Sequence, residues 1–110
     1  NRLSVEDNSI SFHFQGEDFD IEMVHDENKL NVVVNEFSTN IYFNGKNIFN
    51  FLIPRLVEKS KSNYFTIIIR NSMLFLYKNK KLTLKCLLPM VFTIDKIGVR
   101  TYHKNNWWIS

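Results

Sequence analysis

The sequence predicts an all-β fold, an antiparallel β-sandwich. Apolar and polar residues alternate with a period of two in several short runs, which is typical of strands with one buried and one solvated face. Turn residues interrupt these runs about every 8–12 residues, the spacing expected of a sandwich or a barrel. No amphipathic helix of three turns can be drawn, and the chain contains no alanine, the strongest helix former.

The first 35 residues predict a three-stranded meander. Each strand places apolar residues at alternate positions, and acidic or amide residues occupy the two turns, 16–18 and 26–28. The predicted strands are 10–15, 19–23 and 30–35.

A second hairpin is predicted from the dipeptide Asn44-Gly45, which favours a tight turn after the strand 41–43. The apolar run 48–53 stops at a proline. The polar and basic residues 55–62 are expected to form a loop.

The second half contains the most strongly β-branched segment, 64–70, which we expect to be buried on both faces. Tight turns at 71–72 and 79–80 follow it. The remaining predicted strands are 73–78, 81–87, 95–102 and 107–109.

Length and composition bound the organisation of the chain. Its 110 residues, 45% of them hydrophobic, can form a single domain with its own core, which excludes a disordered chain. No apolar run is long enough to span a membrane, and no signal-peptide pattern opens the sequence. We expect residues 1–110 to be one recognition domain excised from a larger protein.

Charge is divided unequally between the two halves. Residues 1–55 contain four basic and nine acidic side chains, whereas residues 56–110 contain ten basic and two acidic ones. This division predicts either one basic face or a sheet in which acidic and basic strands pair with each other.

The residues that carry enzyme chemistry are sparse. The sequence has no Gly-rich phosphate loop and no zinc-binding His-Glu-x-x-His, and its histidines, at 13, 25 and 103, are far apart. Cys86 is the only cysteine, and its leucine neighbours indicate a buried thiol. We therefore expect no enzyme, no cofactor and no metal site.

Two weaker hypotheses concern the charged residues. The acidic segment 17–27 could bind Ca²⁺ or supply a carboxylate pair, but Asp20 and Glu22 alternate with apolar residues and so belong to the wet face of a strand. Basic residues with interleaved aromatic rings in the second half could bind single-stranded nucleic acid. No RNP-like aromatic motif is present, so nucleic acid is the least favoured partner.

The dipeptide Trp107-Trp108 closes the last predicted strand. Neighbouring residues of a strand face opposite ways, so one ring is expected in the core and the other at the surface. An exposed Trp can anchor a sugar ring or a protein partner, or can cover a sheet edge.

The segment from 19 to 35 resembles the galectin carbohydrate-recognition domain, one of the concanavalin-like jelly rolls. That family has a strand, a His-x-Asn-x-Arg turn and a Val-Val-x-Asn strand, and here His25 is followed by Asn28-Lys29 and then by Val32-Val33-Val34-Asn35. The segments 64–69, 75–80 and 94–99 look like later strands of the same family. The resemblance implies contacts to a galactoside from His25, Asn28, Lys29 and Asn35. Lys29 stands in place of the family's arginine, and Tyr42 could offer an aromatic face near the position of the family's tryptophan.

The end of the chain is also similar to the domain named after farnesoic acid O-methyltransferase. That domain ends in a Gly-x-x-Thr followed by a Trp, and here Gly98-Val99-Arg100-Thr101 leads to Trp107. The resemblance implies a binding module, and the chain has no cofactor loop of its own.

The sequence therefore predicts a non-catalytic, lectin-like module that binds a glycan or a protein surface. The alternative is a protein-interaction or assembly domain, including a homo-oligomer, that uses the charge division or a free sheet edge. The candidate ligand-binding residues are His25, Asn28, Lys29, Asn35, Tyr42, Trp107 and Trp108.

Overall fold

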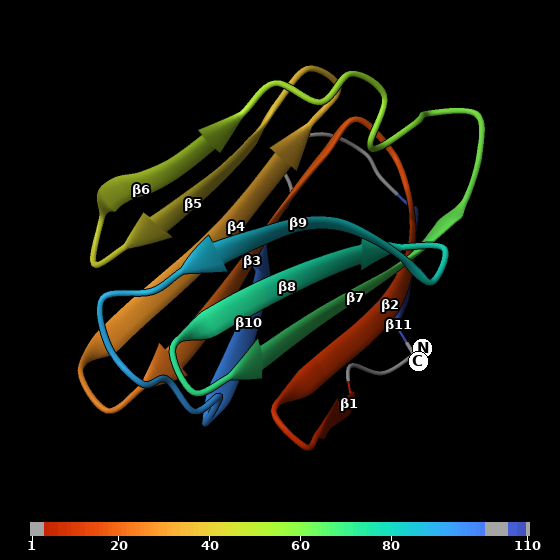
Figure 1. The fold of residues 1–110 in the computed structure, drawn as a ribbon. Coiled ribbons are helices and arrows are strands. Elements are labelled where there is room, and N and C mark those ends of the chain that lie inside the picture. The colour runs from red at the N-terminus through yellow and green to blue at the C-terminus, as the bar shows by residue number, and fades with distance from the viewer. Residues whose placement is uncertain (1–3, 101–105, 110) are drawn as a thin grey trace.

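The computed structural model of the chain describes residues 4–100 and 106–109, and every regular element among them is a strand. Two antiparallel sheets are stacked face to face (Figure 1). Sheet A contains β1 (Ser4–Glu6), β2 (Ser9–Gln15), β7 (Asn63–Arg70), β8 (Met73–Lys78), β9 (Lys81–Leu87) and β11 (Asn106–Ile109). Sheet B contains β3 (Asp18–His25), β4 (Asn28–Asn35), β5 (Thr39–Phe43), β6 (Lys46–Phe51) and β10 (Lys96–Arg100).

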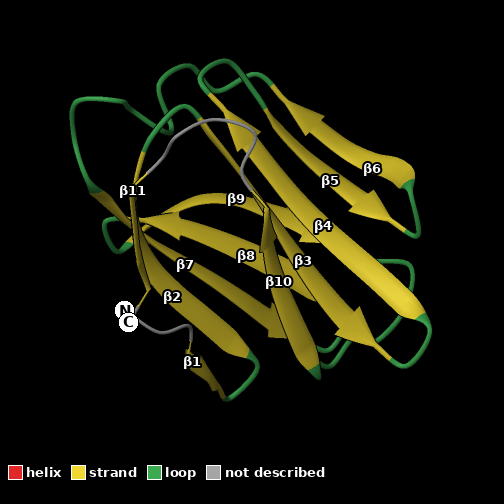
Figure 2. Cartoon of the chain, turned by 180° about the vertical axis from the view of Figure 1, so that it is seen from behind, coloured by secondary structure: helices red, strands yellow, loops and turns green. Residues whose placement is uncertain are grey.

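Most strands pair with their neighbours in sequence, and along the described strands the chain changes sheet four times: between β2 and β3, β6 and β7, β9 and β10, and β10 and β11. Sheet B runs in the order β10-β3-β4-β5-β6, and sheet A in the order β1-β2-β7-β8-β9. The strand β11 pairs with β2, so the last described strand returns to the beginning of the chain (Figure 2). The predicted antiparallel β-sandwich is confirmed.

Phenylalanine rings from both sheets meet in the centre of the core. Phe19 of sheet B contacts three rings of sheet A, those of Phe12, Phe14 and Phe65, at centroid distances of 5.2, 5.2 and 5.3 Å. All three contacts have edge-to-face geometry, which the ring quadrupole favours. This cluster of four rings joins the two layers.

The Asn8 side chain links the turn between β1 and β2 to two distant segments. Its Nδ2 donates to the carbonyl oxygens of Ile69 at 3.2 Å and Phe92 at 2.9 Å, while its Oδ1 accepts from the Ile94 amide at 2.6 Å. Asn8 has a φ of 60°, a conformation that asparagine tolerates better than most residues. The side chain therefore attaches the segment that leads into β10 to the edge of sheet A.

The structure corrects three details of the predicted strands. In β7 one face is buried, but Tyr64, Thr66 and Ile68 on the other face are only half-buried, because no described layer covers the outer side of sheet A. The hairpin strand predicted after Asn44-Gly45 is β6, and it ends at Phe51, two residues before the end of the apolar run 48–53. The alternation also missed β1, which is too short to show a period.

The charge division of the sequence follows the two sheets with three exceptions. Strands β3–β6 of the acidic half all lie in sheet B, and β7–β9 of the basic half all lie in sheet A. The exceptions are β1 and β2, which lie in sheet A, and β10, which lies in sheet B, where its Arg100 pairs in register with Asp20 of β3. The basic half therefore lies mostly in one sheet, as the first alternative predicts, while β10 pairs with an acidic strand, as the second predicts.

A search of the described residues for a helix long and apolar enough to cross a membrane finds none.

We predict that the ring cluster contributes much of the stability. Phe19 is 1% exposed, and Phe19→Ala should lower the free energy of unfolding by about 3–5 kcal/mol, because it removes three ring contacts and leaves a cavity. Phe37→Ala is the matched control, since Phe37 is 74% exposed, and should change it by about 0.5 kcal/mol or less. Urea unfolding followed by fluorescence measures both. Equal effects would contradict the role of the cluster.

Candidate functional site

The outer side of sheet B carries amides, carboxylates, a lysine and one aromatic ring, which we call the polar face. The half-buried Val24 and Val33 lie among them on the same side. Buried residues alternate with its members along each strand, so the members point away from the core. The strand register aligns Glu22, Asn31, Tyr42 and Asn47 in one row across four strands. The polar face consists of Asp20, Glu22, Lys29, Asn31, Asn40, Tyr42 and Asn47.

A hydrogen-bond network fixes one part of the polar face. The Nδ2 of Asn31 donates to Asp20 Oδ1 at 2.9 Å and to Glu22 Oε2 at 3.4 Å. Asp20 is only 6% exposed, so its amide partner offsets part of the cost of burying the carboxylate. The side-chain oxygen of Asn31, Oδ1, makes no hydrogen bond to any described residue and is available to a ligand.

The other part of the polar face surrounds Tyr42. Next to it, Asn47 Nδ2 donates to Asn40 Oδ1 at 3.1 Å, and Asn40 Nδ2 donates to Ser38 Oγ at 3.3 Å. Tyr42 is half-buried between Asn31 and Asn47. At the far edge, Gly98 of β10 lies opposite Glu22 and adds no side chain to the row. The face thus offers planar polar groups beside one aromatic ring.

His25, one of the predicted ligand residues, lies at the end of β3 rather than on the polar face. Its Nδ1 is 3.0 Å from Asp95 Oδ2, and its ring packs edge-on against Phe92 at 5.7 Å. His25, Asp26 and Asp95 place three potential ligand atoms within 4.8 Å of one another. The Asp26 amide also donates to Asp95 Oδ2, so these contacts connect the β3–β4 turn to the start of β10.

Asn28 and Lys29 lie close to His25 and bind the neighbouring hairpin turn. Asn28 Oδ1 accepts from Asn44 Nδ2 at 3.0 Å, and the Lys29 amide donates to Asn44 Oδ1 at 2.8 Å. The exposed Lys29 side chain faces outward two residues before Asn31. Because Asn31 pairs with Tyr42, Lys29 lies diagonal to Tyr42 at the margin of the polar face. Of the residues predicted from sequence, Lys29 and Tyr42 therefore come together on this face.

Asn35 lies at the opposite end of β4, about 23 Å from Asn28 for an extended strand. Its Oδ1 accepts from the amides of Phe37 at 2.8 Å and Ser38 at 2.9 Å, and so shapes the β4–β5 turn. Trp107 and Trp108 belong to sheet A, where the register sets them opposite Phe14 and His13. Their side chains lie outside the described residues.

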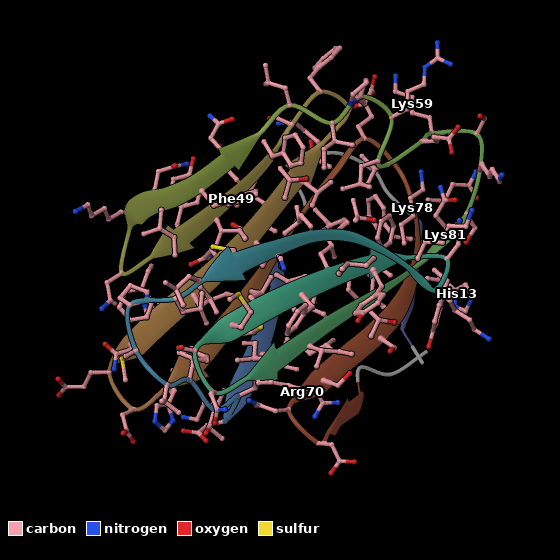
Figure 3. The ribbon with its side chains drawn as sticks, viewed as in Figure 1. His13, Phe49, Lys59, Arg70, Lys78 and Lys81 are labelled. Atoms are coloured by element: carbon pink, nitrogen blue, oxygen red, sulfur yellow. The ribbon has the colours of Figure 1, made fainter. Side chains whose placement is uncertain are left out.

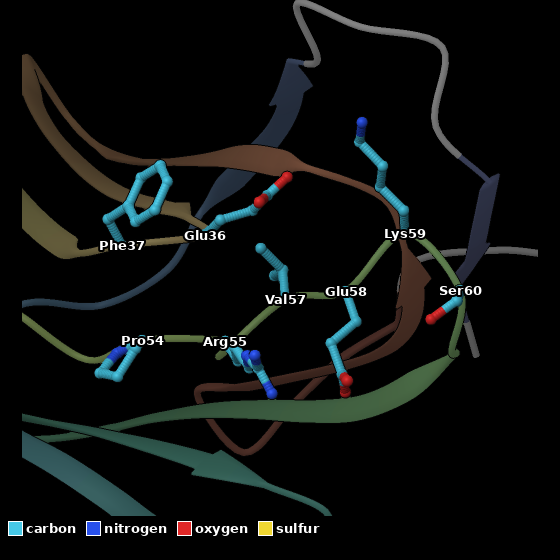
Figure 4. Close-up of a pocket in the computed structure, with 8 residues that line it drawn as sticks. All are labelled: Glu36, Phe37, Pro54, Arg55, Val57, Glu58, Lys59 and Ser60. Carbon is cyan, nitrogen blue, oxygen red and sulfur yellow. The ribbon is translucent and has the colours of Figure 1, made fainter.

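A hollow of about 550 Å³ lies at the Asn35 end of the sandwich (Figure 4). The β4–β5 turn contributes Glu36 and Phe37, and the connection between β6 and β7 contributes the other walls. Its lining residues are Glu36, Phe37, Pro54, Arg55, Val57, Glu58, Lys59 and Ser60. The Arg55 amide donates to the Glu36 carbonyl oxygen at 2.8 Å, so the two walls are joined through the backbone.

The single cysteine is buried, as the sequence predicts. Cys86 is 4% exposed within the core, and burial raises the pKa of its thiol. The thiol is therefore held in its protonated form at neutral pH.

Sequence reasoning placed Asp20 and Glu22 on the solvated face of a strand but selected neither as a ligand-binding residue. It also did not select three further members of the polar face: Asn31, Asn40 and Asn47. The signal was the alternation itself, because a meander with short turns brings the solvated positions of neighbouring strands into one row. Matching a family motif instead selected residues at the strand ends.

Comparison with known proteins finds similarity in structure. No family model matches the chain, and no curated protein matches its sequence. Among solved structures, the chain is similar to the carbohydrate-binding module CBM66 from Bacillus subtilis, with a TM-score of 0.58 and 13% sequence identity. The match covers 94% of this chain and 77% of that chain. The two chains share a fold.

We predict that Asn35 acts on the turn. Asn35→Ala should lower the free energy of unfolding by about 1–2 kcal/mol, because two turn amides lose their acceptor. Asn35→Asp retains an acceptor oxygen at that position, so its free energy of unfolding should be closer to that of the wild type. Thermal unfolding of both variants tests this, and an unaltered Asn35→Ala would show that the turn forms without the side chain.

Proposed function

We propose that the chain is a non-catalytic recognition module that binds a glycan on the polar face, with Tyr42 at its centre. The row Glu22, Asn31, Tyr42 and Asn47 carries this proposal. Sugars present hydroxyl groups around the ring edge and C–H groups on the ring faces. The amides and carboxylates of the row suit the hydroxyl groups, and the tyrosine ring suits a sugar face.

Preorganisation supports the proposal. Asn31 is held by Asp20 and Glu22, and Asn47 is held by Asn40, so these groups lose little freedom when a ligand binds. The fold shared with a carbohydrate-binding module is consistent with this use of the sandwich.

A protein-assembly role remains the alternative and has less support. Strand β9 forms an edge of sheet A among the described strands, but it carries Lys81 and Lys85 and has a register shift opposite Leu76 and Tyr77. Lysines and irregular pairing at an edge oppose the addition of another strand.

We predict that Tyr42→Ala weakens glycan binding about tenfold, because it removes the aromatic surface at the centre of the row. A glycan array identifies the ligand, and titration calorimetry with that glycan measures the loss. Asn31→Ala should weaken binding as well, since it removes an amide from the same row.

The matched control is Tyr77→Ala, which removes a half-buried tyrosine from the outer side of sheet A. Glycan affinity should be unchanged in this variant. A wild-type protein that binds no glycan on the array, or equal losses in the two tyrosine variants, would refute the proposal.

A further inference from the structure

Four cations gather at one end of the sandwich, and we call them the end stripe: Arg55, Lys78, Lys80 and Lys81. Lys78 Nζ donates to the Arg55 carbonyl oxygen at 3.0 Å, which connects the β6–β7 connection to the β8–β9 hairpin. Lys78 and Lys81 are partners across that hairpin. Figure 3 shows Lys59, Lys78, Lys81 and His13 one after another at this end.

The neighbouring carboxylates do not neutralise the end stripe. Glu17 forms an ion pair with Lys59, and Glu58 Oε2 accepts from Asn63 Nδ2 at 3.2 Å. Within the described part of the chain, none of the four cations of the stripe has a carboxylate partner. The stripe therefore presents uncompensated positive charge to the solvent.

Two of these cationic residues have a backbone conformation that is unfavourable for their residue type. Eight described residues other than glycine have a positive φ, and six of them are Asn or Asp, which tolerate this conformation. The other two are Arg55, with a φ of 60°, and Lys80, with a φ of 69°. Glycine or asparagine would suit both positions better, so the cationic side chains are not explained by the turns.

Aromatic rings lie next to the stripe on the outer side of sheet A. The rings of His13 and Tyr64 are 4.7 Å apart and line a hollow of about 460 Å³ together with Asn79 and Lys80. Tyr77 faces outward on the adjacent strand, diagonal to Tyr64. Three rings on neighbouring strands thus lie near Lys80 of the hairpin turn. Lys78, which pairs with the inward-facing Phe65, and its partner Lys81 project from the core-facing side of the sheet at the same end of the sandwich.

Hydrogen bonds hold the hairpin turn rigidly beside this hollow. Asn79 Oδ1 accepts from the Tyr64 amide at 2.9 Å, and Asn79 Nδ2 donates to Asn63 Oδ1 at 3.0 Å. Asn63 in turn binds Glu58. The Asn79 side chain is committed to the turn, which leaves Lys80 and the two rings as the groups that a ligand can contact.

We propose that the end stripe and these rings bind single-stranded nucleic acid. The cations contact successive phosphates, and exposed bases stack on His13, Tyr64 and Tyr77. A cationic track beside aromatic side chains is the arrangement by which proteins hold single strands without reading their sequence. The site is on the opposite sheet from the polar face, so it does not depend on glycan binding.

Fluorescence anisotropy with a labelled oligothymidylate of about twelve nucleotides tests the proposal. At low salt we expect a dissociation constant of about 10 µM. The logarithm of the affinity should fall with the logarithm of the salt concentration at a slope of about −3, since each phosphate contacted on a single strand contributes about −0.7.

Lys80→Gly is the sharpest variant, because glycine fits the positive φ and the turn should fold at least as well as in the wild type. We expect weaker binding and a salt slope shallower by about 0.7. Tyr64→Leu should weaken binding about tenfold with the salt slope unchanged, because it removes stacking and no charge.

The hairpin of sheet B offers a matched charge control. Lys81 and Lys46 each follow a two-residue turn, Asn79-Lys80 and Asn44-Gly45 respectively. Lys81→Gln should weaken binding of the oligothymidylate, whereas Lys46→Gln should not, although the net charge changes equally.

Three results would overturn the proposal. The first is no binding at about 100 µM protein in low salt. The second is an equal affinity for a duplex of the same length, which would exclude base stacking. The third is tighter binding of dextran sulfate that Lys80→Gly weakens and Tyr64→Leu does not, which would assign the end stripe to a sulfated polysaccharide.

Discussion

The stacking of two sheets through the phenylalanine cluster is the constraint on which the rest of the structure depends. Phe19 is the ring of sheet B that contacts Phe12, Phe14 and Phe65 of sheet A. Because residues alternate along a strand, fixing which residues face inward also fixes every residue that faces outward. The polar face and the rings beside the end stripe are both consequences of this one choice.

The two outer faces then differ in chemistry because most of each half of the chain stays in one sheet. Strands β3–β6 bring carboxylates and amides to sheet B, whereas β7–β9 bring lysines and half-buried aromatic rings to sheet A. The sandwich therefore presents a hydrogen-bonding surface on one side and a cationic, aromatic one on the other. The glycan site and the nucleic-acid site that we propose therefore lie on opposite sides of the sandwich.

Turn geometry connects stability with these surfaces. Asn8, Asn44 and Asn79 adopt positive φ, and their side chains bind neighbouring segments, so each turn is also a tie between elements. Arg55 and Lys80 also adopt a positive φ, but their side chains do not form such ties between elements. Their side chains are exposed at the end of the sandwich, where they carry charge on which the proposed nucleic-acid site depends.

The sequence by itself determined the fold class, most strand positions and the buried state of Cys86, because alternation with a period of two is a local property of the chain. It could not determine which solvated residues would share a face. Asn31 and Tyr42 are eleven positions apart, and Lys78 and Arg55 are farther still, yet each pair is adjacent in space. Register and sheet order make these neighbours, and both arise from packing the two layers together. Only the tertiary structure therefore decided that Tyr42 lies among amides and that the cations of the second half border aromatic rings.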